Sequence, residues 1–185
     1  MRLNELKAIL ERHKIPTESW GRGEAKTLSH LLAEIHGEEV VLQEESDRLL
    51  RVIATVMLDV YCAVGNKVLV LKEDRQIFHD GRCRSRSLNT SLGEKMKRGE
   101  KAEEAARRAL REELCITENL PFTQTSEPRT ESAPSRSFPG LLTMNTHYTL
   151  KVSLPQNHYR AEGYIERQSD KTTYFVWETK KNDSL

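Results

Sequence analysis

Three glutamates in the middle of the chain have the residue type and the spacing to bind a hard metal cation. Glu112 and Glu113 are adjacent, and adjacent helical residues lie about 100° apart around the axis. Glu100 stands one turn before the same predicted helix. Mg²⁺ prefers carboxylate oxygens and keeps several waters, which a phosphate group can displace. Such a cation bridges a diphosphate and stabilises the charge that develops on it during cleavage.

The same glutamates have a plainer explanation as part of a solvated helix. Apolar residues recur there every four positions, at Ala102, Ala106, Leu110 and Leu114. This stripe predicts a helix from about residue 102 to residue 114. Its small alanines would let the helix lie close against a sheet. A charged face opposite an apolar stripe needs no other function, and on composition alone this explanation is the more frequent one.

The segment Gly93 to Ile116 resembles the Nudix box, which is written G-x5-E-x7-R-E-U-x-E-E-x-G-U with U a bulky aliphatic residue. The residues that match are Glu100, Arg108, Leu110, Glu112, Glu113 and Ile116. The resemblance extends over roughly residues 49–177, because a predicted hairpin precedes the box and predicted strands follow it. It implies an α/β fold, specifically a Nudix-like α/β/α sandwich with a mixed β-sheet.

Three positions depart from the family pattern. Glu94 replaces the first glycine of the box, and Cys115 replaces the late glycine. Ala109 stands where the family has a glutamate directly after the arginine. In many members that glutamate is a metal ligand or helps to activate water. Because residue 109 lies three and four positions before Glu112 and Glu113, we expect it to share their face of the helix.

By resemblance, the chain is a hydrolase that cleaves a diphosphate bond in a nucleoside-diphosphate-type compound with Mg²⁺ or Mn²⁺. Glu100, Glu112 and Glu113 would be the metal ligands. Arg108, Glu112 and Glu113 would form the catalytic group, in which Arg108 positions the carboxylates. The resemblance predicts a small-molecule diphosphate substrate and does not identify the residues that select it.

The alanine at position 109 leaves the source of a general base open. If hydrolysis persists, candidates by type and region are Glu131, His147, Glu162 and Glu166. If no base replaces the missing glutamate, little activity would remain, since general-base catalysis typically contributes about 10²–10⁴-fold. The alternative function is a hydrolysis-deficient nucleotide-binding, partner-binding or regulatory module. A third hypothesis is a protein that binds partners through its N-terminal helices.

The elements around the box follow from hydrophobic periodicity. Residues 1–45 are predicted to form a helical N-terminal appendage, 46–180 the Nudix-like domain and 181–185 a frayed tail. Helices are expected near residues 3–10 and 24–36, and strands over 40–42, 52–64, 67–72, 141–154 and 172–177. Residues 121–140, rich in Ser, Thr, Pro and Arg, indicate a long mobile loop. Its end, residues 135–142, could shape a pocket or be only a turn.

Composition restricts the class of protein further. The formal net charge is +1, which gives no indication of a nucleic-acid partner. The chain has three cysteines, none at a metal-ligand spacing, so a reducing compartment fits best. The first ten residues are charged and lack an apolar signal core, and no apolar run reaches membrane-spanning length. We therefore expect a cytoplasmic protein with no membrane partner, and a homodimer stays an open option.

Overall fold

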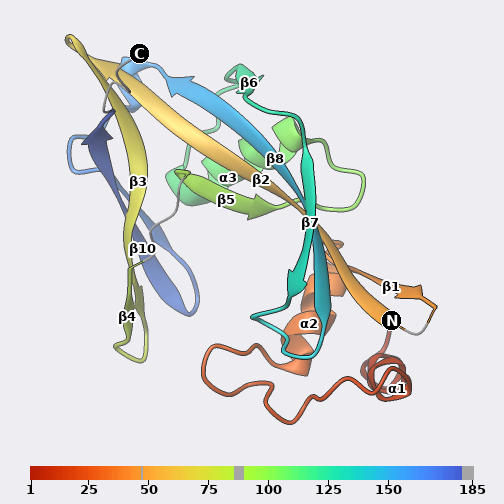
Figure 1. Cartoon of the computed structure of the whole chain (residues 1–185). Coiled ribbons are helices and arrows are strands. Elements are labelled where there is room, and N and C mark those ends of the chain that lie inside the picture. The colour runs from red at the N-terminus through yellow and green to blue at the C-terminus, as the bar shows by residue number, and fades with distance from the viewer. Residues whose placement is uncertain (47, 86–89, 181–185) are drawn as a thin grey trace. The chain divides into compact units, whose positions relative to one another are not determined.

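The computed structural model describes residues 1–46, 48–85 and 90–180, and these ranges form two compact units (Figure 1). Unit 1 comprises residues 1–55, 95–100 and 128–147, and unit 2 comprises residues 56–94, 101–127 and 148–185. Two long strands, β2 (Arg48–Val64) and β8 (Leu142–Leu154), contribute residues to both units. The domain boundary predicted near residue 45 stays a prediction. The predicted frayed tail, 181–185, lies outside the described residues.

Unit 1 contains the predicted N-terminal helices, α1 (Leu3–Arg12) and α2 (Leu28–His36). The expected start of the second helix at residue 24 is wrong. The helix begins four residues later because the hydroxyl of Thr27 accepts a hydrogen bond from the backbone N–H of His30, at 3.3 Å, and so caps the first turn. Strand β1 (Val41–Glu45) follows and pairs antiparallel with β2.

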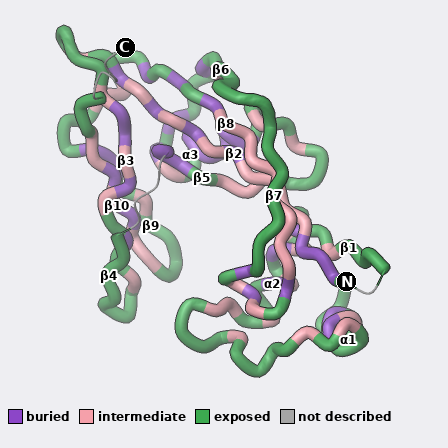
Figure 2. The backbone as a smooth tube through the Cα atoms, viewed as in Figure 1, coloured by how far each residue is buried: buried purple, intermediate pink, exposed green. Residues whose placement is uncertain are grey.

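Residues 121–140 do not form the long loop that their composition predicts. They contain β6 (Phe122–Gln124) and β7 (Arg129–Pro134), which both pair antiparallel with β8. All of β7 is exposed, as its green tube in Figure 2 shows. A strand that is solvated on both faces has no apolar alternation, so the usual sequence signal for a strand is missing. Its order comes from backbone hydrogen bonds to β8.

The core of unit 1 joins the N-terminal fifty residues to the segment that follows β7. Buried apolar side chains of the two helices, of the residue before β1 and of β2 pack with those that follow β7, namely Leu6, Leu10, Leu31, Val40, Leu49, Phe138 and Leu141. Trp20 packs its ring against Phe138, with 5.2 Å between centroids, and its indole N–H donates to the carbonyl of Pro139 at 2.9 Å. The segment after β7 is therefore anchored in this core.

Unit 1 also contains a cluster of ion pairs centred on the buried carboxylate of Glu34. Glu34 accepts one bond from Arg51 and one each from Lys26 and Lys95, all at 2.7 Å. Glu34 and Arg51 are only 7% and 5% exposed. Burial raises the pKa of Glu34, but its bonds to the three cations outweigh that effect and hold the pKa at about 2. Glu34 is therefore ionised and shared among three positive charges.

Unit 2 carries the predicted hairpin and the box helix. Strand β2 turns into β3 (Lys67–Phe78), with Val64 paired to Lys67. Helix α3 (Ala102–Leu114) has the predicted bounds. The other elements are β4 (Cys83–Arg84), β5 (Leu92–Lys95), the 3₁₀ turn η1 (Gln156–His158), β9 (Tyr164–Arg167) and β10 (Lys171–Thr179). The sequence did not predict β9, and β3 is six residues longer than expected.

The sheet is mixed, as predicted. Its main path runs β6-β8-β2-β3-β10-β9. The pairings of β3 with β2 and β10, of β10 with β9, and of β8 with β6 and β7 are antiparallel. Strands β2 and β8 are neighbours that run in the same direction in Figure 1. Among the described residues, no helix is long and apolar enough to cross a membrane.

Candidate functional site: an acidic cleft beside the box helix

Unit 2 has a cleft of about 210 Å³ where α3, β3, β5 and β9 bring acidic side chains together. Five glutamates and one lysine line it, along with uncharged polar residues. The charged members are Glu73, Glu94, Glu112, Glu113, Glu166 and Lys171. The structure thus brings the predicted pair Glu112 and Glu113 into one cleft with three further carboxylates. This surplus of negative charge favours a cation.

Glu113 is surrounded by other acidic side chains of the cleft. Burial raises its pKa well above the usual value, and the negative charges of Glu166, Glu94 and Glu73 raise it further, while Lys171 opposes them. Glu112, by contrast, has a side chain that is 51% exposed. A bound cation would relieve the repulsion at Glu113, because it favours the ionised form of every carboxylate around it.

Replacing Glu113 by glutamine is expected to stabilise the fold at neutral pH. The folded-state pKa of Glu113 is raised, so the folded state binds more protons than the unfolded state. Stability is therefore lost as pH rises from the unfolded-state value of 4.5 through the raised pKa. Thermal unfolding of wild type and Glu113→Gln between pH 4 and pH 8 would show a gap that widens with pH. Equal pH dependence of the two proteins would contradict the assignment.

Glu166 is the candidate base that the fold brings to the box. It lies on β9 and lines the cleft with Glu113. Glu131 and His147 belong to unit 1, where the imidazole Nε2 of His147 lies 2.9 Å from a carboxylate oxygen of Glu131. Glu162 is exposed and does not line the cleft. Of the four candidates, Glu166 alone lines the acidic cleft.

Arg108 is nearly buried and bonds to the residue that replaces the first box glycine. Its Nη1 donates to Glu94 at 2.8 Å and lies 3.8 Å from Glu112. Glu94 in β5 is therefore an ion-pair partner of the box arginine as well as a departure from the pattern. This contact fits the predicted positioning role of Arg108, which stays a prediction.

Ala109 lies in the same row of α3 as Glu113, as the spacing predicts. It is completely buried and does not line the cleft, whereas Glu112 is half exposed. Ala105, Ala109 and Glu113 follow each other at intervals of four, so this row of α3 leads from the core to the cleft. In this chain, position 109 is part of the packing of α3.

Glu100 and the pair Glu112 and Glu113 belong to different units of the chain. Glu100 belongs to unit 1, and its carboxylate accepts a hydrogen bond from the backbone N–H of Lys97 at 2.8 Å. Glu112 and Glu113 belong to unit 2. The role of Glu100 as a metal ligand therefore stays a prediction.

The cleft residues Glu73 and Gln76 were not predicted from the sequence, because a β-bulge in β3 changes which face of the strand they occupy. Glu73 and Gln76 are three residues apart, so in a regular strand they would point to opposite faces. Arg75 pairs with Tyr174 and Glu73 with Phe175, which leaves Asp74 as an extra residue in β3. The bulge shifts the alternation. Both Glu73 and Gln76 are therefore buried and line the cleft.

The position of Cys115, where the box has its late glycine, has a left-handed backbone with φ of 58°. The backbone N–H groups of Cys115 and Ile116 both donate to the carbonyl of Leu110 as α3 ends. Glycine favours this conformation because it has no Cβ to clash with the backbone. The family pattern and the local geometry therefore agree on what position 115 requires.

Replacing Cys115 by glycine is expected to raise the free energy of unfolding by about 0.5–1 kcal/mol, since the relief of the left-handed strain exceeds the added entropy of the unfolded chain. Urea denaturation monitored by circular dichroism would measure the change. Cys115→Ala removes the thiol and keeps the strain, so it should stay close to wild type. A glycine variant no more stable than the alanine variant would contradict the prediction.

The cleft matches a metal ion in the chemistry of its donors. Its donors are of the right type, since carboxylate oxygens suit hard cations. Thr173 also lines the cleft and is almost completely buried, and its hydroxyl has no hydrogen-bond partner among the described residues. However, no three His, Cys, Asp or Glu side chains within the described ranges are placed to hold one metal ion. The protein side chains alone thus fit a cation in chemistry but not as a closed coordination shell.

No family model and no curated protein matches the chain, whereas solved structures do. An Ap4A hydrolase of C. elegans is 16% identical, with a TM-score of 0.39 over 68% of this chain and 79% of that one. The NUDIX domain of Shewanella oneidensis NrtR, solved with ADP ribose, is 17% identical, with a TM-score of 0.37 over 69% and 72%. The T. brucei MERS1 protein is 16% identical, with a TM-score of 0.43 over 96% and 82%.

These likenesses are too partial to support an argument about function. The order of elements in the structure can be compared with the order that the box resemblance implies. The order that the resemblance implies is a hairpin, then the box helix, then further strands. The structure has this order, with β2 and β3, then α3, then β6 to β10.

Proposed function

We propose that the acidic cleft of unit 2 binds the diphosphate group of a nucleoside-diphosphate-type compound together with Mg²⁺ or Mn²⁺, and that it hydrolyses the diphosphate bond. The observation that carries this proposal is the gathering of five carboxylates, the box pair Glu112 and Glu113 among them, around one small cleft. Carboxylates in this number repel a bare diphosphate. A cation is therefore needed before such a substrate can enter.

Glu112 and Glu113 are the residues that would hold the cation, with oxygens of the diphosphate completing its shell. Mg²⁺ is often bound in this way, by one or two carboxylates plus substrate phosphates. This explains how the cleft could work although no three side chains of the described residues converge as metal ligands. When bound, the cation would supply positive charge against the phosphate oxygens. The bond from Arg108 to Glu94 would keep the α3 end of the cleft in place.

We assign Glu166 the role of general base in place of the glutamate missing at position 109. It would accept a proton from the water that attacks phosphorus. Burial and the neighbouring carboxylates raise the pKa of Glu113 well above its usual value. Thr173, whose buried hydroxyl has no partner among the described residues, would donate to a phosphate oxygen.

The test is hydrolysis by the purified full chain with Mg²⁺ or Mn²⁺ and a panel of nucleoside-diphosphate compounds. Glu166→Gln is expected to lose about 10²–10⁴-fold in kcat. Glu113→Gln should need far more Mg²⁺ for activity. Glu162→Gln and Glu103→Gln are matched controls, since both residues are exposed and outside the cleft, and they should retain full activity. An active wild type that is insensitive to Glu113→Gln and Glu166→Gln would refute the assignment.

A second function, binding without hydrolysis, is favoured by one observation. The carboxylate that many family members place after the arginine is replaced here by a buried alanine outside the cleft. In this case the panel would show no turnover, while calorimetry would still show Mg²⁺-dependent binding that Glu113→Gln weakens. Turnover and binding measured on the same compounds therefore separate the two functions.

A further inference from the structure

Unit 1 has a cavity of its own, of about 200 Å³, between the ends of β7 and β8. Arg51 and Arg136 line it, together with the hydroxyl residues Ser135, Ser137 and Thr143. We propose that this cavity binds a phosphate group, either as free phosphate or as a phosphate monoester. The proposal concerns residues outside the acidic cleft and does not depend on hydrolysis there.

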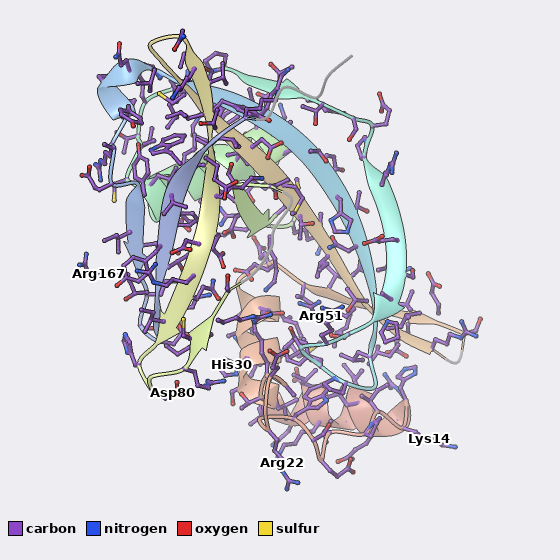
Figure 3. The ribbon with its side chains drawn as sticks, turned by 60° about the vertical axis from the view of Figure 1, so that its left-hand side comes forward. Lys14, Arg22, His30, Arg51, Asp80 and Arg167 are labelled. Carbon is purple, nitrogen blue, oxygen red and sulfur yellow. The ribbon has the colours of Figure 1, made fainter. Side chains whose placement is uncertain are left out.

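Arg51, which is labelled in Figure 3, has a side-chain N–H donor without an acceptor among the described residues. Its Nη2 donates to Glu34 at 2.7 Å, and its Nη1 makes a long bond of 3.4 Å to the Thr143 hydroxyl. Its Nε is buried and has no hydrogen-bond partner among the described residues. A buried charged donor without a partner is costly. Since Arg51 lines the cavity, an oxyanion there would supply the missing acceptor after a small shift of the guanidinium.

The positive charge of Arg51 is only partly balanced by the carboxylate of Glu34. Its carboxylate partner, Glu34, also bonds to Lys26 and Lys95. One negative charge thus serves three positive ones, and Lys95 also bonds to Glu39 at 3.0 Å. Arg51, Lys26 and Lys95 thus share the two carboxylates of Glu34 and Glu39, and Arg51 lines the cavity. An anion in the cavity would balance the charge of Arg51.

The other residues that line the cavity supply further hydrogen-bond donors for a phosphate group. Arg136 is exposed at the rim of the cavity. The hydroxyl of Ser135 accepts from the backbone N–H of Phe138 at 3.0 Å, so its own O–H is left to donate. The one acidic residue in the lining, Glu131, lies 2.9 Å from the imidazole of His147. Arginine forks combined with hydroxyl donors suit the several oxygens of a phosphate.

The test is a titration of the ¹⁵N-labelled full chain with inorganic phosphate at constant ionic strength, followed by amide chemical shifts. Saturable shifts are expected at Ser135, Arg136 and Thr143. Arg136→Gln should weaken binding about tenfold, as should Arg51→Lys, which keeps the charge and loses the guanidinium fork. Arg22→Gln, an exposed arginine of the same unit outside the cavity, should bind as wild type does.

A parallel titration with a nucleoside monophosphate distinguishes the two sources of the group. Tighter binding than inorganic phosphate, still lost in Arg136→Gln, identifies a phosphate monoester as the ligand, and equal binding identifies free phosphate. Glu113→Gln should leave both titrations unchanged, because Glu113 lies in the acidic cleft. Shifts that do not saturate, or that persist unchanged in both Arg136→Gln and a folded Arg51→Lys, would overturn the proposal.

Discussion

Replacing Ala109 by glutamate is expected to lower the free energy of unfolding by about 3 kcal/mol at neutral pH and to add no hydrolytic activity. The substitution restores the family's box by sequence, but Ala109 is completely buried. The new side chain would have to push into the packing of α3 and would place a charge where water cannot reach it. Glu113 lies four residues on, among the carboxylates Glu166, Glu94 and Glu73, and a further carboxylate beside it would add to the negative charge there.

Urea denaturation at several pH values, together with the diphosphate assay, would test this expectation. The stability of Ala109→Glu should fall as pH rises, because the buried acid must ionise. Ala109→Leu adds bulk without charge and separates the two causes. Ala102→Glu, on the less buried part of the same helix, should change stability little. A stable Ala109→Glu variant that gains Mg²⁺-dependent turnover would show that the wild-type cleft lacks only this carboxylate.

Replacing Glu34 by leucine is expected to destabilise unit 1 by about 3–5 kcal/mol, because removing one partner of a buried ion pair leaves the other charge uncompensated. Arg51 would remain buried without its carboxylate, and Lys26 and Lys95 would lose the same acceptor. Chemical denaturation, with a probe in unit 1 such as the fluorescence of Trp20, would measure the loss.

The double variant Glu34→Leu, Arg51→Leu should recover much of that stability, since it removes both charges and fills the space with apolar groups. Glu44→Gln is the control on an exposed cluster, in which Glu44 pairs with Arg12 and His13, and it should change stability little. A loss in Glu34→Leu no greater than in Glu44→Gln would mean that the buried cluster does not hold the unit together.

The buried cluster also predicts the response of unit 1 to acid. The folded-state pKa of Glu34 is about 2, below the ordinary value of 4.5. Its contribution is therefore complete above the unfolded-state pKa and is lost as pH falls from 4.5 through 2. The acid limb of the stability profile should consequently be steeper in wild type than in the double variant.

The sequence by itself determined the box helix and its hairpin. The apolar stripe at intervals of four fixes α3 from Ala102 to Leu114, and turn residues between two β-branched runs fix the β2–β3 hairpin. The left-handed backbone at Cys115 was not predicted, although the glycine that the family carries there was a signal that could have indicated it. The helix and the hairpin depend on neighbours in the chain, so local spacing is enough to predict them.

The tertiary structure decided which carboxylates share a cleft and which position is buried. Glu73, Glu94 and Glu166 join Glu112 and Glu113 because β3, β5, β9 and α3 are brought together, and a single extra residue in β3 sets the face of Glu73 and Gln76. Strand β7 exists because β8 supplies its hydrogen bonds. Such pairings join residues far apart in sequence, and no local pattern records them. The burial of Ala109, on which the choice between hydrolysis and binding turns, follows from the same packing.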